Sequence, residues 1–189
     1  GASLIKAILI NGATDMLGQY TPCNAPAAGP NNNEACKPTP NNHEGWGRLN
    51  MTNSLFPSER FTTLGFKDNI TDVLNANGQI RNYTKIKFSF NKPLAVTLVW
   101  TDRPDTVAGA GAVINDLDLI LTLIDSGLTY RGNVFNTSGD SIENTGNRDN
   151  AINNVEKVFV RQPKDGIYNI TVRAQTIPSA AMPQTFSIV

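Results

Sequence analysis

From residue 80 onward, apolar residues recur with a period of two, and this pattern limits the fold more than any other feature of the sequence. In 117–124, leucines at every second position alternate with polar or β-branched residues, which is typical of a strand with one buried face. Turn signals such as Asp125-Ser126-Gly127 separate such segments, and no helical pattern lies between them. The predicted strands are centred on 85–90, 94–100, 117–124, 128–131, 155–160, 167–173 and 184–189.

Strands joined by turns rather than helices predict a mainly β protein, an antiparallel β-sandwich or jelly roll. The 189 residues are about one domain's length and allow a sizeable core. We expect a boundary near residue 75, at Asn75-Ala76-Asn77-Gly78, between a helix-and-loop part (1–75) and a β part (76–189).

Residues 2–13 predict a helix that is apolar on nearly every side, since only Lys6 and Asn11 are clearly polar. Such a helix needs packing partners on several sides. It could dock on this chain's own core, or it could belong to a larger body outside this sequence. We favour the larger body, because the remaining sequence predicts few other helices. Asn11-Gly12 marks the expected end of the helix.

The charges exclude some function classes. Lys and Arg number 16, as do Asp and Glu, so the formal net charge is zero. A general nucleic-acid binder needs a basic excess to neutralise phosphates, so we expect no nucleic-acid partner. No apolar run reaches the ~18 residues of a membrane-spanning helix, so we expect no membrane span.

The cysteines and asparagines bear on the compartment. Cys23 and Cys36 lie in an irregular stretch, 18–45, and a disulfide there would stabilise the fold by about 3 kcal/mol. Two unrelated thiols are the alternative. A disulfide indicates an oxidising compartment, so we expect a secreted or extracellular protein. Five asparagines also fit the Asn-x-Ser/Thr glycosylation pattern, although accidental matches in an asparagine-rich chain would explain them equally well. They are Asn50, Asn69, Asn82, Asn136 and Asn169.

Four groups of residues carry a family resemblance. In chain order they are the helical segment 2–13; Gly45-Trp46-Gly47-Arg48-Leu49-Asn50; Trp100-Thr101-Asp102 with Asn115-Asp116-Leu117-Asp118-Leu119; and Asn153-Asn154-Val155-Glu156 with Gly166-Ile167-Tyr168. Together they resemble the C-terminal part of subtilisin-like serine proteases that carry a jelly-roll domain after the catalytic domain. The resemblance implies that 1–75 is the end of an α/β catalytic domain and that 76–189 is the accessory jelly roll.

The catalytic residues of that family have no match here. The family uses an Asp, a His and a Ser, with the Ser in a Gly-Thr-Ser motif, whereas Gly1-Ala2-Ser3 runs into the next helical segment. A triad needs a His within hydrogen-bond reach of the nucleophile, and His43 is the only His, in a polar loop. We therefore expect this chain to be inactive alone. The resemblance implies that the triad lies upstream of Gly1, or on a cleaved companion chain, and that the parent acts on protein substrates.

A pair of carboxylates suggests a metal site. Asp116 and Asp118 share one face of their strand, where they repel unless they are solvated or share a cation. Calcium takes six to eight oxygen ligands, and the resemblance makes calcium the expected ion. A solvent-facing edge is the alternative. The further donors would be Asp102, Asn115, Asn154 and Glu156. A second acidic group, whose polarity a loop explains well, comprises Asp140, Glu143 and Asp149.

Two functions follow. The first is a non-catalytic C-terminal segment of a secreted subtilisin-like serine endopeptidase, which stabilises the catalytic domain, shapes substrate access and binds calcium. The second is an extracellular glycoprotein module for binding or assembly without protease activity. Jelly rolls also serve as lectin domains, and Tyr130, Asn133 and Phe135 would be the sugar-binding cluster. A core at the end of a strand explains those three residues as well.

Overall fold

The computed structural model describes residues 1–16, 38–42, 44–55, 63–88, 92–104, 113–143, 146, 152–178 and 183–189. Within these ranges the chain forms two helices and nine strands. The helices are α1 (Ala2–Gly12) and α2 (Met51–Leu55). The strands are β1 (Lys67–Leu74), β2 (Ile80–Phe88), β3 (Leu94–Trp100), β4 (Asp116–Leu123), β5 (Thr129–Phe135), β6 (Ser141–Glu143), β7 (Val155–Val160), β8 (Gly166–Thr176) and β9 (Gln184–Ile188).

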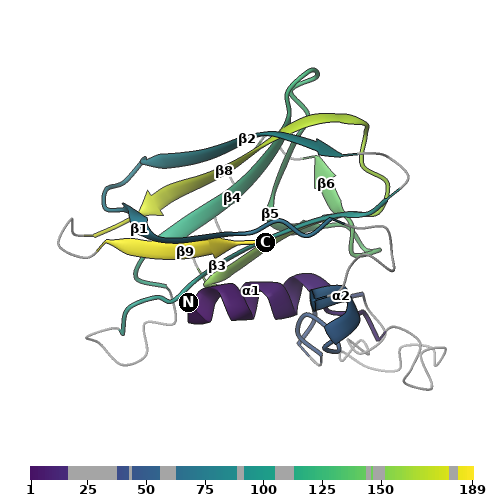
Figure 1. Cartoon of the computed structure of the whole chain (residues 1–189), viewed down its shortest axis with the longest axis horizontal. Helices are drawn as coiled ribbons and strands as arrows, with labels where there is room; N and C mark the ends of the chain where they lie inside the picture. The colour runs from purple at the N-terminus through teal and green to yellow at the C-terminus, as the bar shows by residue number, and fades with distance from the viewer. Residues whose placement is uncertain are drawn as a thin grey trace.

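The strands form two antiparallel sheets. A four-stranded sheet has the order β1-β9-β3-β7, and a five-stranded sheet has the order β2-β8-β4-β5-β6. Figure 1 shows the two sheets as layers, with α1 beneath the four-stranded sheet and away from the five-stranded one. The prediction of a mainly β, antiparallel protein is therefore confirmed.

The space between the sheets holds the main hydrophobic core. The leucines of β4 at 117, 119, 121 and 123 all point into it, as the period of two predicts. Across from them lie buried residues of the other sheet, among them Leu98 and Phe186. Trp100 is 1% exposed, and its ring nitrogen donates a hydrogen bond to the Asn115 carbonyl at 2.8 Å. A buried indole N–H normally finds such a partner.

Two strands were not expected from the sequence. Among the described strands, β1 pairs only with β9, at the edge of its sheet. Most of its side chains are half-buried or exposed, so it lacks a clear alternation. β6 spans only Ser141–Glu143. β1 also places one strand of the sheets on the N-terminal side of residue 75. The division into domains at that residue stays a prediction.

Several expected features lie outside the described residues. They are Cys23 and Cys36 with most of the loop around them, His43, and Asp149. Among the helices that the structure describes, neither is long and apolar enough to cross a membrane.

Candidate functional site

The inner face of α1 packs against the four-stranded sheet and forms a second hydrophobic cluster. Ala7 is fully buried there with Val99 of β3, Val155 of β7 and Val189. A small residue at this point lets the helix backbone approach the sheet closely. Half-buried residues on both sides of the contact join the cluster, namely Leu4, Ile8, Ile10, Trp46 and Leu64.

Hydrogen bonds between side chains attach the same face of α1 to the strands. Ser3 and Ser187 of β9 share a bond of 2.7 Å between their hydroxyls, and Ser187 donates to Asp68 of β1 at 2.7 Å. Nearer the end of the helix, the Thr97 hydroxyl donates to the Asn11 side chain at 2.8 Å. Because buried polar groups need partners, these bonds allow serines and a threonine to lie in an otherwise apolar contact.

Lys157 of β7 contacts the last turn of α1 and is only 8% exposed. Its ammonium group donates to the Ile10 carbonyl at 3.0 Å, a favourable place for a cation near a helix C-terminus. It also lies 5.8 Å from the ring centroid of Trp46 and 5.9 Å from that of Phe159. Burial lowers the pKa of Lys157 to about 8. The charge is thus held by a carbonyl and two aromatic faces.

The Gly-Trp-Gly turn closes against the chain that follows α1. Gly45 and Gly47 have φ of 58° and 102°, in the left-handed region that favours glycine. A Cβ on Gly47 would lie 2.5 Å from the Thr14 carbonyl oxygen. Trp46 packs edge-on against Phe135 at 6.4 Å between ring centroids. The turn therefore connects α1 to the five-stranded sheet through an aromatic pair.

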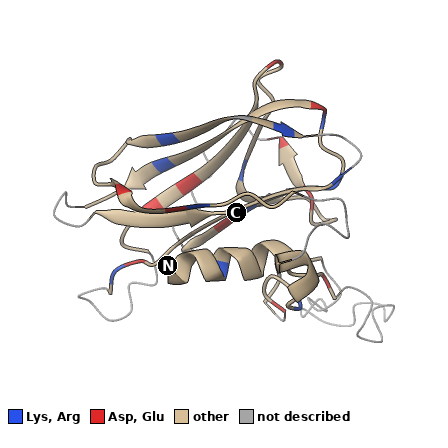
Figure 2. Ribbon diagram, in the orientation of Figure 1, with Lys and Arg blue, Asp and Glu red and all other residues tan. Residues whose placement is uncertain are grey.

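The outer face of α1, which we define as Ala2, Ile5 and Leu9, points away from the sheet. Ile5 is 63% exposed, Ala2 is exposed and Leu9 is half-buried. Figure 2 shows that α1 is almost free of charge. α2 adds exposed apolar side chains, those of Met51 and Leu55, each 48% exposed. The inner face of the helix docks on this chain's own sheet, and the outer face is not covered by the described residues. That the helix also belongs to a larger body stays a prediction.

α2 is held against the end of α1 by a glycine. A Cβ on Gly12 would lie 2.3 Å from the Ser54 hydroxyl and 2.7 Å from the Ser54 nitrogen. We expect Gly12→Ala to displace α2 and to lower the free energy of unfolding by about 2 kcal/mol, since overpacking of this kind costs about 1–3 kcal/mol. Urea unfolding measures the change in the free energy of unfolding. Gly65→Ala is the matched control, because no described residue lies within 4 Å of the Cβ that would be added and its φ is not positive. Equal stability of the two variants would contradict the close approach.

The residues expected to bind calcium are engaged elsewhere. Asp102 accepts hydrogen bonds from the backbone nitrogens of Ile114 and Asn115, at 2.5 and 3.0 Å. The Asn154 side chain accepts from Lys6 at 3.0 Å, and Glu156 accepts from the Leu119 nitrogen at 2.5 Å.

Asp116 and Asp118 lie side by side on β4, as predicted, but they are only 4% and 5% exposed, so the alternative of a solvent-facing edge is wrong. No group of three or more His, Cys, Asp or Glu in the described ranges could hold a metal ion. The four acidic ligands expected, Asp102, Asp116, Asp118 and Glu156, therefore form no such group. Calcium binding by this chain stays a prediction.

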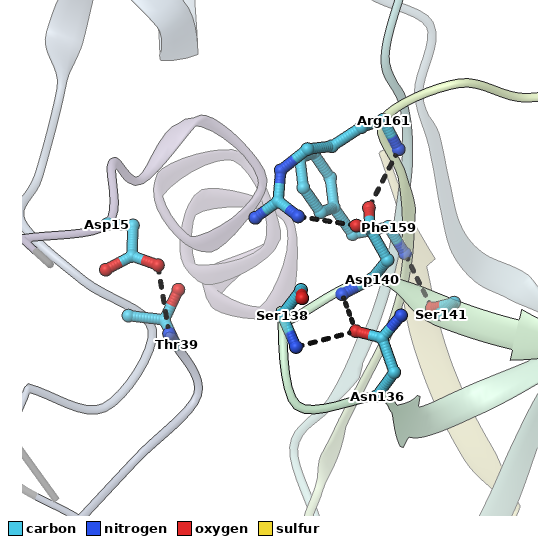
Figure 3. Close-up of polar contacts among 8 residues, drawn as sticks. All are labelled: Asp15, Thr39, Asn136, Ser138, Asp140, Ser141, Phe159 and Arg161. Atoms are coloured by element: carbon cyan, nitrogen blue, oxygen red, sulfur yellow. Dashed lines mark hydrogen bonds and ion pairs between the residues drawn. The ribbon is translucent and has the colours of Figure 1, made fainter. Parts of the chain in front are cut away.

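Of the second acidic group, Asp140 forms contacts that stabilise a turn after β5. Figure 3 shows Asp140 paired with Arg161, whose backbone nitrogen also donates to Asp140 at 3.0 Å. Asn136 accepts hydrogen bonds from the backbone nitrogens of Ser138 and Asp140, at 2.8 and 3.0 Å. A shallow pocket beside this turn is lined by Asp140, Val160, Arg161 and Gln162. Glu143 is exposed on β6.

The residues considered for sugar binding do not form an exposed cluster. Tyr130 is 7% exposed and belongs to the main core. Asn133 uses its side chain to bond the backbone of β7, at the Val155 carbonyl and the Lys157 nitrogen, at 2.8 and 3.0 Å. Phe135 is half-buried against Trp46. An aromatic platform for a sugar is not formed by these residues.

Three residues that fix α1 were not expected from the sequence, namely Lys157, Ser3 and Thr97. A lysine in the apolar run Val155–Val160 was a usable signal, because a charge within a buried strand needs a partner. Serine and threonine gave no such signal, since both are common on strand surfaces.

The fold and this site define an antiparallel, two-sheet β protein with an apolar helix docked on one sheet. Among curated proteins, the Serine protease/ABC transporter B family protein tagB of Dictyostelium discoideum is 28% identical over 220 residues. The alignment covers 99% of this chain but only 11% of that much longer protein. No protein-family model matches the chain. The likeness indicates a protease-related segment at most.

Proposed function

We propose that this chain is the non-catalytic C-terminal segment of a secreted, subtilisin-like serine endopeptidase. In this proposal α1, α2 and the Gly-Trp-Gly turn complete the catalytic domain, and the two sheets are the jelly-roll accessory domain. The segment stabilises the catalytic domain and shapes access of protein substrates to its cleft. The triad lies upstream in the same protein or on a cleaved companion chain.

The outer face of α1 is the observation that carries the proposal. An isoleucine 63% exposed in a nearly uncharged helix is expensive to leave in water, because burying such a side chain contributes about 1.5–3 kcal/mol. The inner face is already fixed to the sheet by Ala7, Ser3 and Lys157. A helix held on one side and apolar on the other suits a place between two bodies. The likeness to a protein named as a serine protease supports a catalytic segment as the second body.

A fluorophosphonate probe, which labels activated serines, tests the proposal on the full-length parent protein. We expect the label on a peptide upstream of Gly1 and none within this segment. Denatured protein is the control for non-specific labelling. A parent that takes no label, or one labelled within residues 1–189, would refute the proposal.

The role of the outer face has its own test. We expect Ile5→Glu to lower the stability of the full-length parent by about 2 kcal/mol or more, since removal of a central interface contact commonly costs that much. Thermal unfolding and the rate of probe labelling both measure it. Ile80→Glu is the matched control, because Ile80 is 48% exposed on β2 in the other sheet. Equal effects of the two variants would show that the outer face docks nothing.

The second candidate, an assembly module without a protease, uses the same outer face with another partner. The probe experiment separates the two. Calcium binding remains a further proposal, resting on the adjacent Asp116 and Asp118, and calcium titration into chelator-treated parent protein tests it. A rise in melting temperature is the expected result.

A further inference from the structure

The five Asn-x-Ser/Thr sites differ in what the structure does with the side-chain nitrogen, Nδ2. In N-glycosylation the Nδ2 of asparagine attacks C1 of an oligosaccharide carried on a lipid diphosphate. The C1–N bond forms, the C1–O bond to the diphosphate breaks, and the nitrogen loses one proton to a base. A glycosylated Nδ2 must therefore face solvent, and it can no longer fill a tight contact.

Asn82 meets this requirement. It is exposed on β2, and its side-chain oxygen accepts a hydrogen bond from the Thr171 hydroxyl of the neighbouring strand at 2.7 Å. That bond fixes the oxygen toward the sheet. Within the described part of the chain, Nδ2 makes no hydrogen bond, so it points outward. Thr84, which completes the acceptor pattern, is exposed as well.

Asn136 has the same arrangement on a turn. Its oxygen accepts the two backbone hydrogen bonds from Ser138 and Asp140, drawn as dashed lines in Figure 3. Its nitrogen makes no hydrogen bond to any residue that the structure describes. Both Asn136 and Ser138 are exposed. The turn itself is fixed by the ion pair of Asp140 with Arg161. Asn136 thus also presents, from a fixed amide, a nitrogen to which no described residue is bonded.

The other three sites use their nitrogen inside the fold. Nδ2 of Asn69 on β1 donates to the hydroxyl of Tyr83 on β2, which bridges the two sheets. Nδ2 of Asn50 donates to Thr14 at 3.1 Å, while its oxygen accepts from the backbone nitrogen of Asn53 in α2. Asn169 is half-buried, with a buried oxygen and an Nδ2 that donates to Thr171 at 3.1 Å.

We propose that Asn82 and Asn136 carry N-linked glycans and that Asn50, Asn69 and Asn169 do not. The inference rests on the secreted compartment of the proposed function, but not on protease activity. Asn82 lies on the sheet that faces away from α1 (Figure 1), so its glycan leaves the outer face of α1 free to dock.

Enzymatic removal of glycans in ¹⁸O-water tests the proposal on full-length parent protein secreted from eukaryotic cells. The glycosidase converts each glycosylated asparagine to an ¹⁸O-labelled aspartate, which peptide mass spectrometry locates. We expect the label at Asn82 and Asn136 and at none of the other three sites. Absence of label at either of the two, or label at any of the other three, would overturn the proposal.

Matched variants give an independent measurement. Thr84→Ala and Ser138→Ala destroy one acceptor pattern each and leave the asparagine in place, so each should remove one glycan-sized step in gel mobility. Thr71→Ala destroys the pattern at Asn69 and should leave mobility unchanged. Fluorophosphonate labelling of the same preparation reads the protease separately: a glycosylated but unlabelled parent refutes the proposed function alone, and a labelled parent without these glycans refutes this inference alone.

Discussion

Glu156→Ala lowers the free energy of unfolding of this chain by about 3 kcal/mol, the largest loss that we expect from a single polar side chain. Glu156 lies on β7 in the four-stranded sheet, is 4% exposed, and accepts a hydrogen bond from the Leu119 nitrogen of β4 in the other sheet. Its removal leaves a buried N–H without that partner, which costs about 1–3 kcal/mol, and opens a cavity besides. Urea unfolding measures the change.

Glu156→Gln is the control for this prediction, because glutamine keeps an oxygen that can accept from Leu119. We expect it to lose clearly less stability than the alanine variant. Gly132→Ala tests the same contact from the other side, since a Cβ there would lie 2.3 Å from a Glu156 carboxylate oxygen. If the alanine and glutamine variants are equally stable, the hydrogen bond to Leu119 contributes nothing.

Lys157→Met should stabilise the chain at pH 7 and change its response to pH. Burial lowers the pKa of Lys157 from 10.5 to about 8, so the folded state binds fewer protons than the unfolded state between these values. Stability of the wild type should therefore rise with pH from about 8 toward 10.5, by about 3 kcal/mol in total. Below pH 8 the cost of burying the charge is present in full, and methionine removes it while keeping the apolar stem.

Urea unfolding at a series of pH values measures this response. The methionine variant should show a much smaller rise from pH 8 to 10, because burial lowers the pKa of Lys6 in both proteins and only the contribution of Lys157 is lost. Above pH 10 the two proteins share a loss of stability, because burial raises the pKa of Tyr83, Tyr130 and Tyr168. A wild-type profile as flat as that of the variant would mean that Lys157 keeps its ordinary pKa in the folded chain.

The main core could be predicted from the sequence because its signal is local. Four leucines at every second position of β4 can face one way only, and all four are buried. The apolar segment at the N-terminus likewise predicted α1, which ends at Gly12 as expected. β1 escaped prediction because an edge strand with little burial carries no alternation.

The candidate site was predictable only in outline. The helix was recognised as needing cover, but the sequence could not tell which face meets the sheet. Ile5 and Ala7 are both apolar, yet the first is 63% exposed and the second fully buried. The choice depends on the close approach that a small side chain allows and on bonds to Thr97 and Ser187, which are distant in sequence.

The sequence by itself determined most of the strands and that α1 is a helix. Only the tertiary structure decided how the polar side chains are used. Glu156 accepts a hydrogen bond from a backbone nitrogen of the other sheet, and Lys157 donates one to the last turn of α1. The amide of Asn82 uses its oxygen in a hydrogen bond to Thr171, whereas that of Asn69 uses its nitrogen in one to Tyr83. The physical reason is that secondary structure follows local periodicity, whereas each of these contacts joins segments far apart in the sequence that meet only in the folded chain.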